Sequence, residues 1–180
     1  MLRVPPDPAP TVYVVGTLDT KAEELAFLCA TLRSGPVAVR LVNVGTQAAT
    51  PEGDVPASVV AGHHPDGAGA VMGLIDRGQA VAAMAVAFER FLSVQPDIAG
   101  VIGIGGGGGT AIITAGLRAL PYGLPKIMVS TMASGNTAPY VGISDLIMVP
   151  AVTDLAGLNS LNRVILHNAA QALLGMVAHP

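Results

Sequence analysis

Residues 101–110 read Val-Ile-Gly-Ile-Gly-Gly-Gly-Gly-Gly-Thr and mark the centre of the predicted fold. The apolar start predicts a buried strand, the glycines predict a turn, and Thr110 begins a predicted helix over residues 111–120. Five successive residues without a Cβ, Gly105, Gly106, Gly107, Gly108 and Gly109, let backbone N–H groups approach a ligand closely. The helix N-terminus adds unpaired donors and partial positive charge, so the stretch suits an anion such as phosphate. The alternative is a flexible glycine linker, which the flanking strand and helix disfavour.

Strand and helix patterns alternate on both sides of this stretch. The predicted strands cover residues 11–15, 37–44, 99–104, 126–131 and 146–149, and the intervening helices end near residues 33, 94, 120 and 177. A right-handed crossover makes the first two strands parallel neighbours. The alternation therefore predicts an α/β fold, a Rossmann-like or flavodoxin-like three-layer sandwich with a mainly parallel sheet.

The chain is long enough for one domain, which we place at residues 11–180. Residues 1–10 contain four prolines and are predicted to be a disordered lead-in. Residues 47–75 are rich in Pro, Gly and Ala and are predicted to form a long irregular insertion. This insertion contains His63-His64-Pro65-Asp66, where a solvated loop is favoured over a metal site because no third ligand is evident.

Composition limits the partners. The chain is 51% hydrophobic but only 12% charged, and this apolar surplus predicts a homo-oligomer or packing against another domain. A net charge of −3 argues against nucleic acid as a partner. No apolar run approaches the ~18–20 residues of a membrane span. The single cysteine, Cys29, excludes an internal disulfide and fits a cytoplasmic location, with the thiol buried in a helix.

The expected site lies beyond the carboxyl ends of the strands. In a flavodoxin-like strand order, residues 16–21 would face residues 105–110 across the point where the order reverses. The first of these loops supplies hydroxyls from Thr17 and Thr20, an ammonium from Lys21, and the Asp19 carboxylate, which is suited to a divalent cation. Helix capping by Asp19 or Thr20 is the alternative role. A third loop on the same edge contains Ser134, Gly135, Asn136 and Thr137.

Three familiar site types do not fit. The spacing of Gly103, Gly105 and Gly108 matches the dinucleotide fingerprint in letters, but no acidic residue follows between Asp97 and Asp145 to bind the ribose. A phosphate-binding P-loop requires Lys-Ser or Lys-Thr after the glycines, and this pair is absent. Ser134 lacks the flanking glycines of a hydrolase nucleophile. No general base or nucleophile is evident, so catalytic residues and enzyme status stay open.

Four segments together resemble one family, the ATP-binding family typified by the tomato mosaic virus resistance protein. They are Val14-Val15-Gly-Thr-Leu-Asp-Thr-Lys-Ala-Glu-Glu-Leu25, Gly103-Ile-Gly-Gly-Gly-Gly-Gly-Thr110, Met128-Val-Ser-Thr-Met-Ala-Ser-Gly-Asn-Thr-Ala-Pro-Tyr140 and Val152-Thr-Asp-Leu-Ala-Gly-Leu-Asn159. The resemblance extends over roughly residues 12–176. The chain differs from the family pattern at Ala22, where a glycine is usual, and at Gly107, where a serine is usual.

The resemblance implies a Rossmann-like domain that binds ATP with magnesium and dimerises near the nucleotide. It also implies a second, TIM-barrel-like domain, which we expect to be absent from these 180 residues. The expected backbone contacts to phosphate come from Gly105–Gly109, with a hydroxyl contact from Thr110. Further contacts to phosphate or metal are expected from Thr17, Asp19, Thr20 and Lys21, and contacts to the sugar or phosphates from Ser134, Gly135, Asn136 and Thr137.

Two alternatives to a nucleotide-binding homodimer remain open. The chain is either half of a two-component ligase-like or kinase-like enzyme, or a protein-interaction module whose dimer is stabilised by nucleotide.

Overall fold

The computed structural model describes residues 11–47 and 52–179, and its centre is a five-stranded, all-parallel sheet. The order β2-β1-β3-β4-β5 confirms the flavodoxin-like arrangement, with Val14 of β1 beside Leu41 of β2 and Ile102 of β3. The predicted lead-in, residues 1–10, lies outside the described residues. The strands are β1 (Thr11–Gly16), β2 (Ala38–Asn43), β3 (Ile98–Gly105), β4 (Lys126–Ser130) and β5 (Ile147–Pro150).

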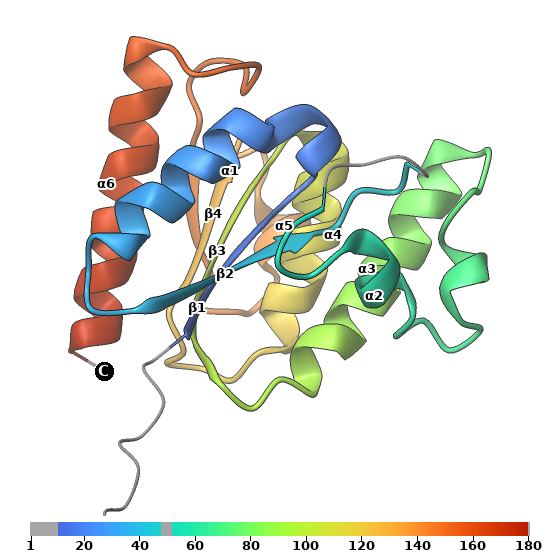
Figure 1. Ribbon diagram of the computed structural model, residues 1–180. Helices are drawn as coiled ribbons and strands as arrows, with labels where there is room; N and C mark the ends of the chain where they lie inside the picture. Colours follow the sequence, from blue (N-terminus) through green and yellow to red (C-terminus); the bar gives the residue numbers. More distant parts are fainter. Residues whose placement is uncertain (1–10, 48–51, 180) are drawn as a thin grey trace, which may run out of the picture.

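Helices cover both faces of the sheet, which confirms the three-layer sandwich (Figure 1). One face packs against α1 (Leu18–Arg33) and α6 (Ser160–Ala178). The other face packs against the remaining helices, which are α2 (Ala57–Ala61), the short 3₁₀ helix η1 (Ala68–Ala70), α3 (Arg77–Ser93), α4 (Gly107–Ala119) and α5 (Ala138–Val141).

Strand side chains alternate between two apolar cores. In β1, Val12 and Val14 join the core under α1 and α6, whereas Tyr13 and Val15 join the core under α3 and α4. All four are fully buried, as expected for a parallel strand that is covered on both faces. This explains why β1 is an uninterrupted apolar run.

The start of α1 differs from the prediction. The helix begins at Leu18, Thr17 occupies the N-cap without a side-chain capping bond, and Lys21 has non-helical angles. The predicted capping role of Asp19 or Thr20 is therefore wrong. The buried side chain of Asn43 instead accepts a hydrogen bond from the Leu18 N–H at 3.2 Å, so an oxygen from β2 satisfies this helix start.

The predicted irregular insertion also needs correction. Residues 48–51 lie outside the described residues, but beyond them Val55 forms a bridge with Val42, followed by α2 and η1. Val60, Ala61 and Val71 are fully buried in the core under α3. Much of this segment is therefore folded, with short helices whose few turns left little periodicity to detect.

No helix in the described part of the chain has the length and apolarity needed to cross a membrane.

Candidate anion-binding site

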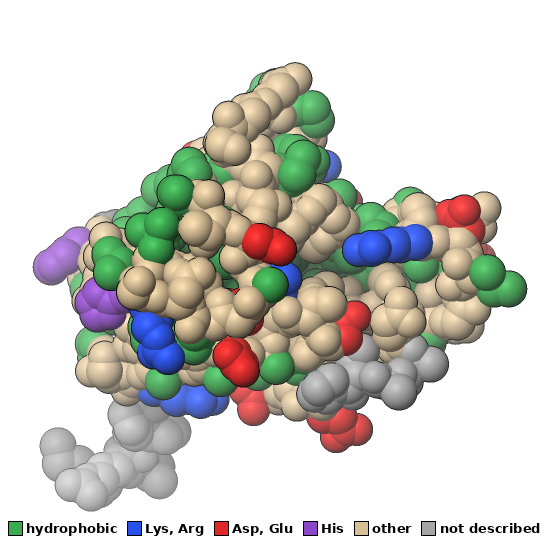
Figure 2. All heavy atoms as spheres, turned by 90° about the horizontal axis from the view of Figure 1, so that it is seen from above, with side chains coloured by type: hydrophobic (Ala, Val, Ile, Leu, Met, Phe, Trp, Pro, Cys, Tyr) green, Lys and Arg blue, Asp and Glu red, His purple; other side chains and the backbone are tan. Residues whose placement is uncertain are grey.

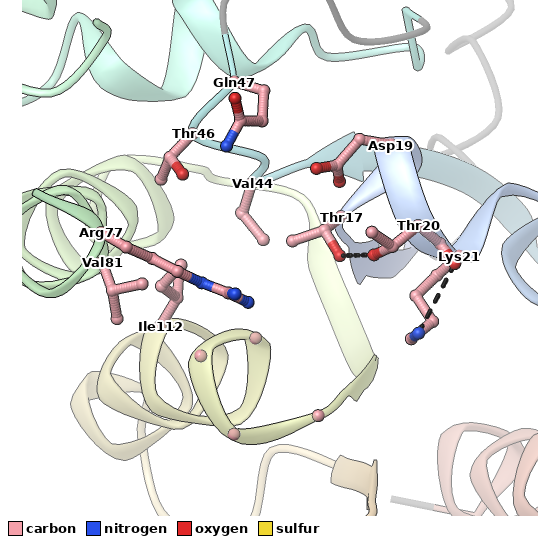
Figure 3. Close-up of a pocket in the computed structure, with 14 residues that line it drawn as sticks. Thr17, Asp19, Thr20, Lys21, Val44, Thr46, Gln47, Arg77, Val81 and Ile112 are labelled. Carbon is pink, nitrogen blue, oxygen red and sulfur yellow. Dashed lines mark hydrogen bonds between the residues drawn. The ribbon is translucent and has the colours of Figure 1, made fainter. Parts of the chain in front are cut away.

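A cavity of about 390 Å³ opens at the carboxyl edge of the sheet, between the ends of β1 and β3 (Figure 3). These strands are neighbours, and the helices that follow them, α1 and α4, pack on opposite faces. Ligands of open α/β sheets bind at such a switch point. The lining residues are Thr17, Asp19, Thr20, Lys21, Val44, Thr46, Gln47, Arg77, Val81, Gly106, Gly107, Gly108, Gly109 and Ile112.

The glycine run forms one wall of this cavity. The helix α4 begins at Gly107, not at Thr110 as predicted, and Gly106 is its N-cap. The first intrahelical bond joins the Thr110 N–H to the Gly106 carbonyl at 2.8 Å. The N–H groups of Gly107, Gly108 and Gly109 precede that bond, and no side chain caps the helix. This wall therefore presents backbone donors and the positive end of the helix dipole.

The fold does not require glycine at positions 106–109. None of these four glycines has a positive φ, and a Cβ added to any of them would meet no atom closer than 3.4 Å. Gly105 is different, because an added Cβ would lie 2.9 Å from the Gly109 carbonyl carbon. Glycine in a helix is less stable than alanine by about 1 kcal/mol. The missing side chains at 107–109 thus reduce helix stability, and together with Gly106 they keep open the space that the cavity occupies.

The opposite wall comes from the first turn of α1. Thr17 Oγ1 and Thr20 Oγ1 are 2.8 Å apart, and Lys21 Nζ lies 3.5 Å from the Thr20 carbonyl oxygen. Asp19 is exposed, and its carboxylate lines the same cavity on the side of Val44 and Gln47 (Figure 3). The structure therefore brings Thr17, Asp19, Thr20 and Lys21 together with the glycine run, as predicted.

A second cation, Arg77, was missed by the sequence analysis. Arg77 is the first residue of α3, and its side chain extends from that helix into the cavity (Figure 3). A cation is disfavoured at a helix N-terminus by the helix dipole. The sequence feature that could have identified Arg77 as a site residue is its position directly after Asp76, which caps α3. The other lining residues that the prediction omitted are Val44, Thr46, Gln47, Val81 and Ile112.

Thr110 does not face the cavity. Its side chain is fully buried, and its Oγ1 lies 2.6 Å from Ser130 Oγ and 3.4 Å from the Gly105 carbonyl oxygen. The hydroxyl therefore joins α4 to the end of β4, and the expected ligand contact is corrected to a structural one. Gly105 is likewise buried within β3, where its carbonyl accepts the Thr131 N–H at 3.3 Å.

The loop after β4 lies outside this cavity. Ser134 lines a separate cavity beyond β4 and β5, whereas Gly135, Asn136 and Thr137 line neither of the two. Asn136 Oδ1 accepts the Ala138 N–H at 3.2 Å, at the start of α5. The structure does not bring these four residues to the glycine run, because the loop turns away toward α5.

Asn43 positions both sides of the cavity mouth. Its Oδ1 accepts hydrogen bonds from the Leu18 N–H at 3.2 Å and the Gly45 N–H at 2.9 Å, and the residue is fully buried. One amide oxygen thus holds the start of α1 and the segment after β2, which leads to Thr46. Burial makes these bonds costly to lose, since two N–H groups would be left unpaired.

The charges of the cavity favour an anion with a bound cation. Lys21 and Arg77 supply two positive charges beside the α4 N-terminus, and Asp19 supplies one carboxylate. The face seen from above, where the strands end, carries both basic and acidic side chains (Figure 2). Among the described residues, no three His, Cys, Asp or Glu side chains converge as a metal site.

The two adjacent histidines have local contacts. The ring of His63 packs edge-on against Phe91 with centroids 5.3 Å apart. His64 Nδ1 accepts the Asp66 N–H at 3.2 Å. Both histidines therefore take part in packing and turn formation in the segment between β2 and α3.

Comparison with known proteins places this geometry in a family context. Residues 10–180 match the model of the uncharacterised protein family UPF0261, N-terminal domain. A UPF0261 protein of Mesorhizobium japonicum is 64% identical over 169 residues, and one of Rhizobium meliloti is 56% identical over 169 residues. The ToMV resistance protein Tm-1 of Solanum lycopersicum is 40% identical over 188 residues.

Each of these matches covers 94% of this chain but much less of the relative. The chain spans 43% and 42% of the length of the two bacterial relatives and 25% of the tomato protein.

Proposed function

This chain belongs to the UPF0261 family, as its N-terminal domain, and from that premise we propose that it binds a nucleotide through its phosphates. ATP with Mg²⁺ is the proposed ligand. The phosphates lie against the N-terminus of α4, and Lys21 and Arg77 neutralise them from two other elements.

The observation that carries this proposal is the unexplained glycine content of the first turn of α4. Gly107–Gly109, which follow the N-cap Gly106, have no positive φ and leave room for a Cβ, so neither strain nor packing accounts for them. Phosphate binding does account for them. A helix N-terminus without side chains lets phosphate oxygens reach the backbone N–H groups, and here these groups line an open cavity that also contains two cations.

The donor set also suits magnesium. Mg²⁺ keeps several waters and is held by one or two carboxylates together with substrate phosphates. Asp19 supplies one such carboxylate in the cavity, and Thr17 and Thr20 supply hydroxyl oxygens. We propose Asp19 as the protein ligand, with the remaining ligands coming from phosphate and water.

Isothermal titration calorimetry tests the site directly. We expect ATP to bind more tightly with Mg²⁺ than without, and Mg²⁺-tripolyphosphate to bind as well, because the phosphates make the main contacts. Arg77→Gln and Lys21→Gln each remove a charge-assisted contact of about 1.5–3 kcal/mol and should weaken binding by about ten- to hundredfold. Gly107→Val fills open space beside Met132 and should abolish binding while the fold is retained.

Two matched controls separate the site from general effects. Arg90 is an exposed arginine at the far end of the same helix as Arg77, so Arg90→Gln should bind normally. Gly175 is exposed on α6 with nothing within 4 Å of an added Cβ, so Gly175→Val should also bind normally. Equal binding by wild type, Arg77→Gln and Gly107→Val, or no binding of any phosphate compound to wild type, would contradict the proposal.

We also propose that the domain functions as a homodimer next to a second domain. The relatives are more than twice as long as this chain, and large apolar side chains are exposed at Ile75 and Ile143. Sedimentation velocity with and without Mg²⁺-ATP tests the dimer. A monomer under both conditions at high protein concentration would contradict it.

A further inference from the structure

A second cavity, of about 530 Å³, lies beyond the ends of β4 and β5. Its lining residues are Thr131, Ser134, Pro150, Val152, Thr153 and Asp154. They come from the two segments that leave neighbouring parallel strands, at the same sheet edge as the candidate anion-binding site.

Thr153 has a polar atom that the fold leaves unsatisfied. Its Oγ1 is buried without a hydrogen-bond partner, and it is the single side-chain atom of this kind in the described residues. A buried unpaired hydroxyl reduces stability, so such atoms are rare without a reason. Thr153 itself is half-buried and lines the cavity, so a rotation of its side chain would bring this hydroxyl within reach of a ligand there.

The backbone beside Thr153 is strained. Val152 has φ = 65°, the single positive φ at a non-glycine position among the described residues. This region is strongly disfavoured for a β-branched residue. The turn is closed by a bond from the Thr153 N–H to the Ala151 carbonyl at 2.7 Å. Strain of this kind concentrates at binding sites, where the surrounding structure holds a side chain in a required position.

The lining has a different chemistry from the anion-binding cavity. Thr131, Ser134 and Thr153 supply hydroxyls, Asp154 supplies a carboxylate, and Pro150 and Val152 supply apolar surface. None of the lining residues is a lysine or arginine. A carboxylate accepts hydrogen bonds from hydroxyl groups but repels a phosphate. The cavity therefore suits a neutral group with several hydroxyls and one apolar face.

Thr131, which lines the second cavity, lies next to Gly106, which lines the first. A Cβ on Gly106 would lie 3.7 Å from Thr131 Oγ1, and the Thr131 N–H donates to the Gly105 carbonyl. We infer that the second cavity binds a polyhydroxyl group next to the phosphates held by α4. This inference rests on the proposed function and deepens it. The polyhydroxyl group is either the ribose of the bound nucleotide or a separate neutral polyol.

Amide shifts in ¹H–¹⁵N spectra test the inference. Mg²⁺-tripolyphosphate should shift the amides of Gly106–Gly109 but not those of Thr131, Ser134 and Thr153. If ribose is the occupant, Mg²⁺-ATP also shifts Thr131, Ser134 and Thr153, and 2′,3′-dideoxy-ATP does not. If a separate polyol is the occupant, D-ribose, D-glucose or myo-inositol added to the tripolyphosphate complex shifts these three amides.

Substitutions provide the second readout. Thr153→Val keeps the side-chain shape and removes the hydroxyl. It should therefore weaken, by about three- to tenfold, the binding of whichever compound shifts the amides of the second cavity. The same change should leave the melting temperature unchanged or raised, because it removes an unpaired buried atom. Asp154→Asn should also weaken binding. Thr137→Val, outside both cavities, is the matched control and should bind normally.

The outcomes separate the two proposals. If none of these compounds shifts Thr131, Ser134 and Thr153, or if Thr153→Val and Asp154→Asn bind as wild type, the inference is overturned. If tripolyphosphate and ATP leave the amides of Gly106–Gly109 unshifted, the proposed function fails. A polyol that still shifts the second cavity in that case would support a polyol site without the adjoining phosphates.

Discussion

At the residue scale, the buried lysine of β4 shows how a single charge is accommodated away from the site. Lys126 Nζ is fully buried, lies 2.6 Å from Asp145 Oδ1, and donates to the Pro121 carbonyl at 2.6 Å. Asp145 Oδ2 also accepts the Gly123 N–H at 2.7 Å. Hydrogen bonds from Lys126 and the Gly123 backbone hold the pKa of the Asp145 carboxyl below its ordinary value. This cluster ties the turn before β4 to the segment that leads into β5.

Asp145 should therefore make stability dependent on acid pH. Its pKa is lower in the folded state than in the unfolded chain, so unfolding takes up a proton and stability falls as pH falls below about 5. Asp145→Asn leaves the buried Lys126 ammonium without a counter-ion and should lower the free energy of unfolding at pH 7. Urea unfolding measured from pH 7 to pH 2.5 should show that the difference in free energy of unfolding between variant and wild type becomes smaller as the pH falls. A difference that stays constant would contradict this.

At the element scale, close packing of α3 on α4 sets the distance across the anion-binding cavity. Phe88 of α3 is fully buried against Gly116 of α4, where an added Cβ would lie 2.6 Å from Phe88 Cδ1 and 3.0 Å from Leu92 Cδ1. Glycine at this position lets the two helices approach. Because α3 begins with Arg77 and α4 begins with the glycine run, this contact also positions Arg77 and the glycines relative to each other in the anion-binding cavity.

Gly116→Val should disturb both stability and binding. Overpacking against a buried ring costs about 1–3 kcal/mol, so the free energy of unfolding should fall by that amount. Displacement of α3 should also weaken Mg²⁺-tripolyphosphate binding in calorimetry, since Arg77 moves with the helix. Gly175→Val is the control, with an expected change within about 0.5 kcal/mol because the position is open. Equal stability of the two variants would refute the packing argument.

At the scale of the whole molecule, the sheet is shared by two apolar cores. Leu28 lies in the core under α1 and α6, and Met84 lies in the core under α3 and α4, each fully buried. Adjacent residues of every central strand belong to opposite cores, so neither core can be lost while the strands remain packed. We infer that both faces unfold together.

Leu28→Ala and Met84→Ala test this cooperativity. Each should lower the free energy of unfolding by about 2–5 kcal/mol through lost burial and a cavity. Native-state hydrogen exchange should show the same loss at the most protected amides of α1 and of α3, whichever face carries the substitution. A loss confined to the helices on the substituted face would show that the two halves unfold separately.

Several features followed from local patterns in the chain. The five strands and the four longer helices were predicted close to their observed bounds, because buried parallel strands and amphipathic helices leave strong periodicities. The cluster Thr17–Lys21 was expected near the glycines from the topology rule alone. In α6, by contrast, the polarity of a residue does not predict its burial. Asn162 is fully buried, and its side chain is satisfied there by accepting the Asn159 N–H and donating to the Gly157 carbonyl, whereas Leu161 is 44% exposed.

The sequence by itself determined the α/β class, the strand succession and the presence of a glycine-rich helix start, because each depends on neighbours within a few residues. Tertiary structure alone decided which groups share the cavity. The packing of α3 on α4 brings Arg77 to the glycine run, and the pairing of β3 with β4 buries the Thr110 hydroxyl against Ser130. Such contacts join residues far apart in the chain, so no local pattern encodes which side chains face the ligand and which join the core.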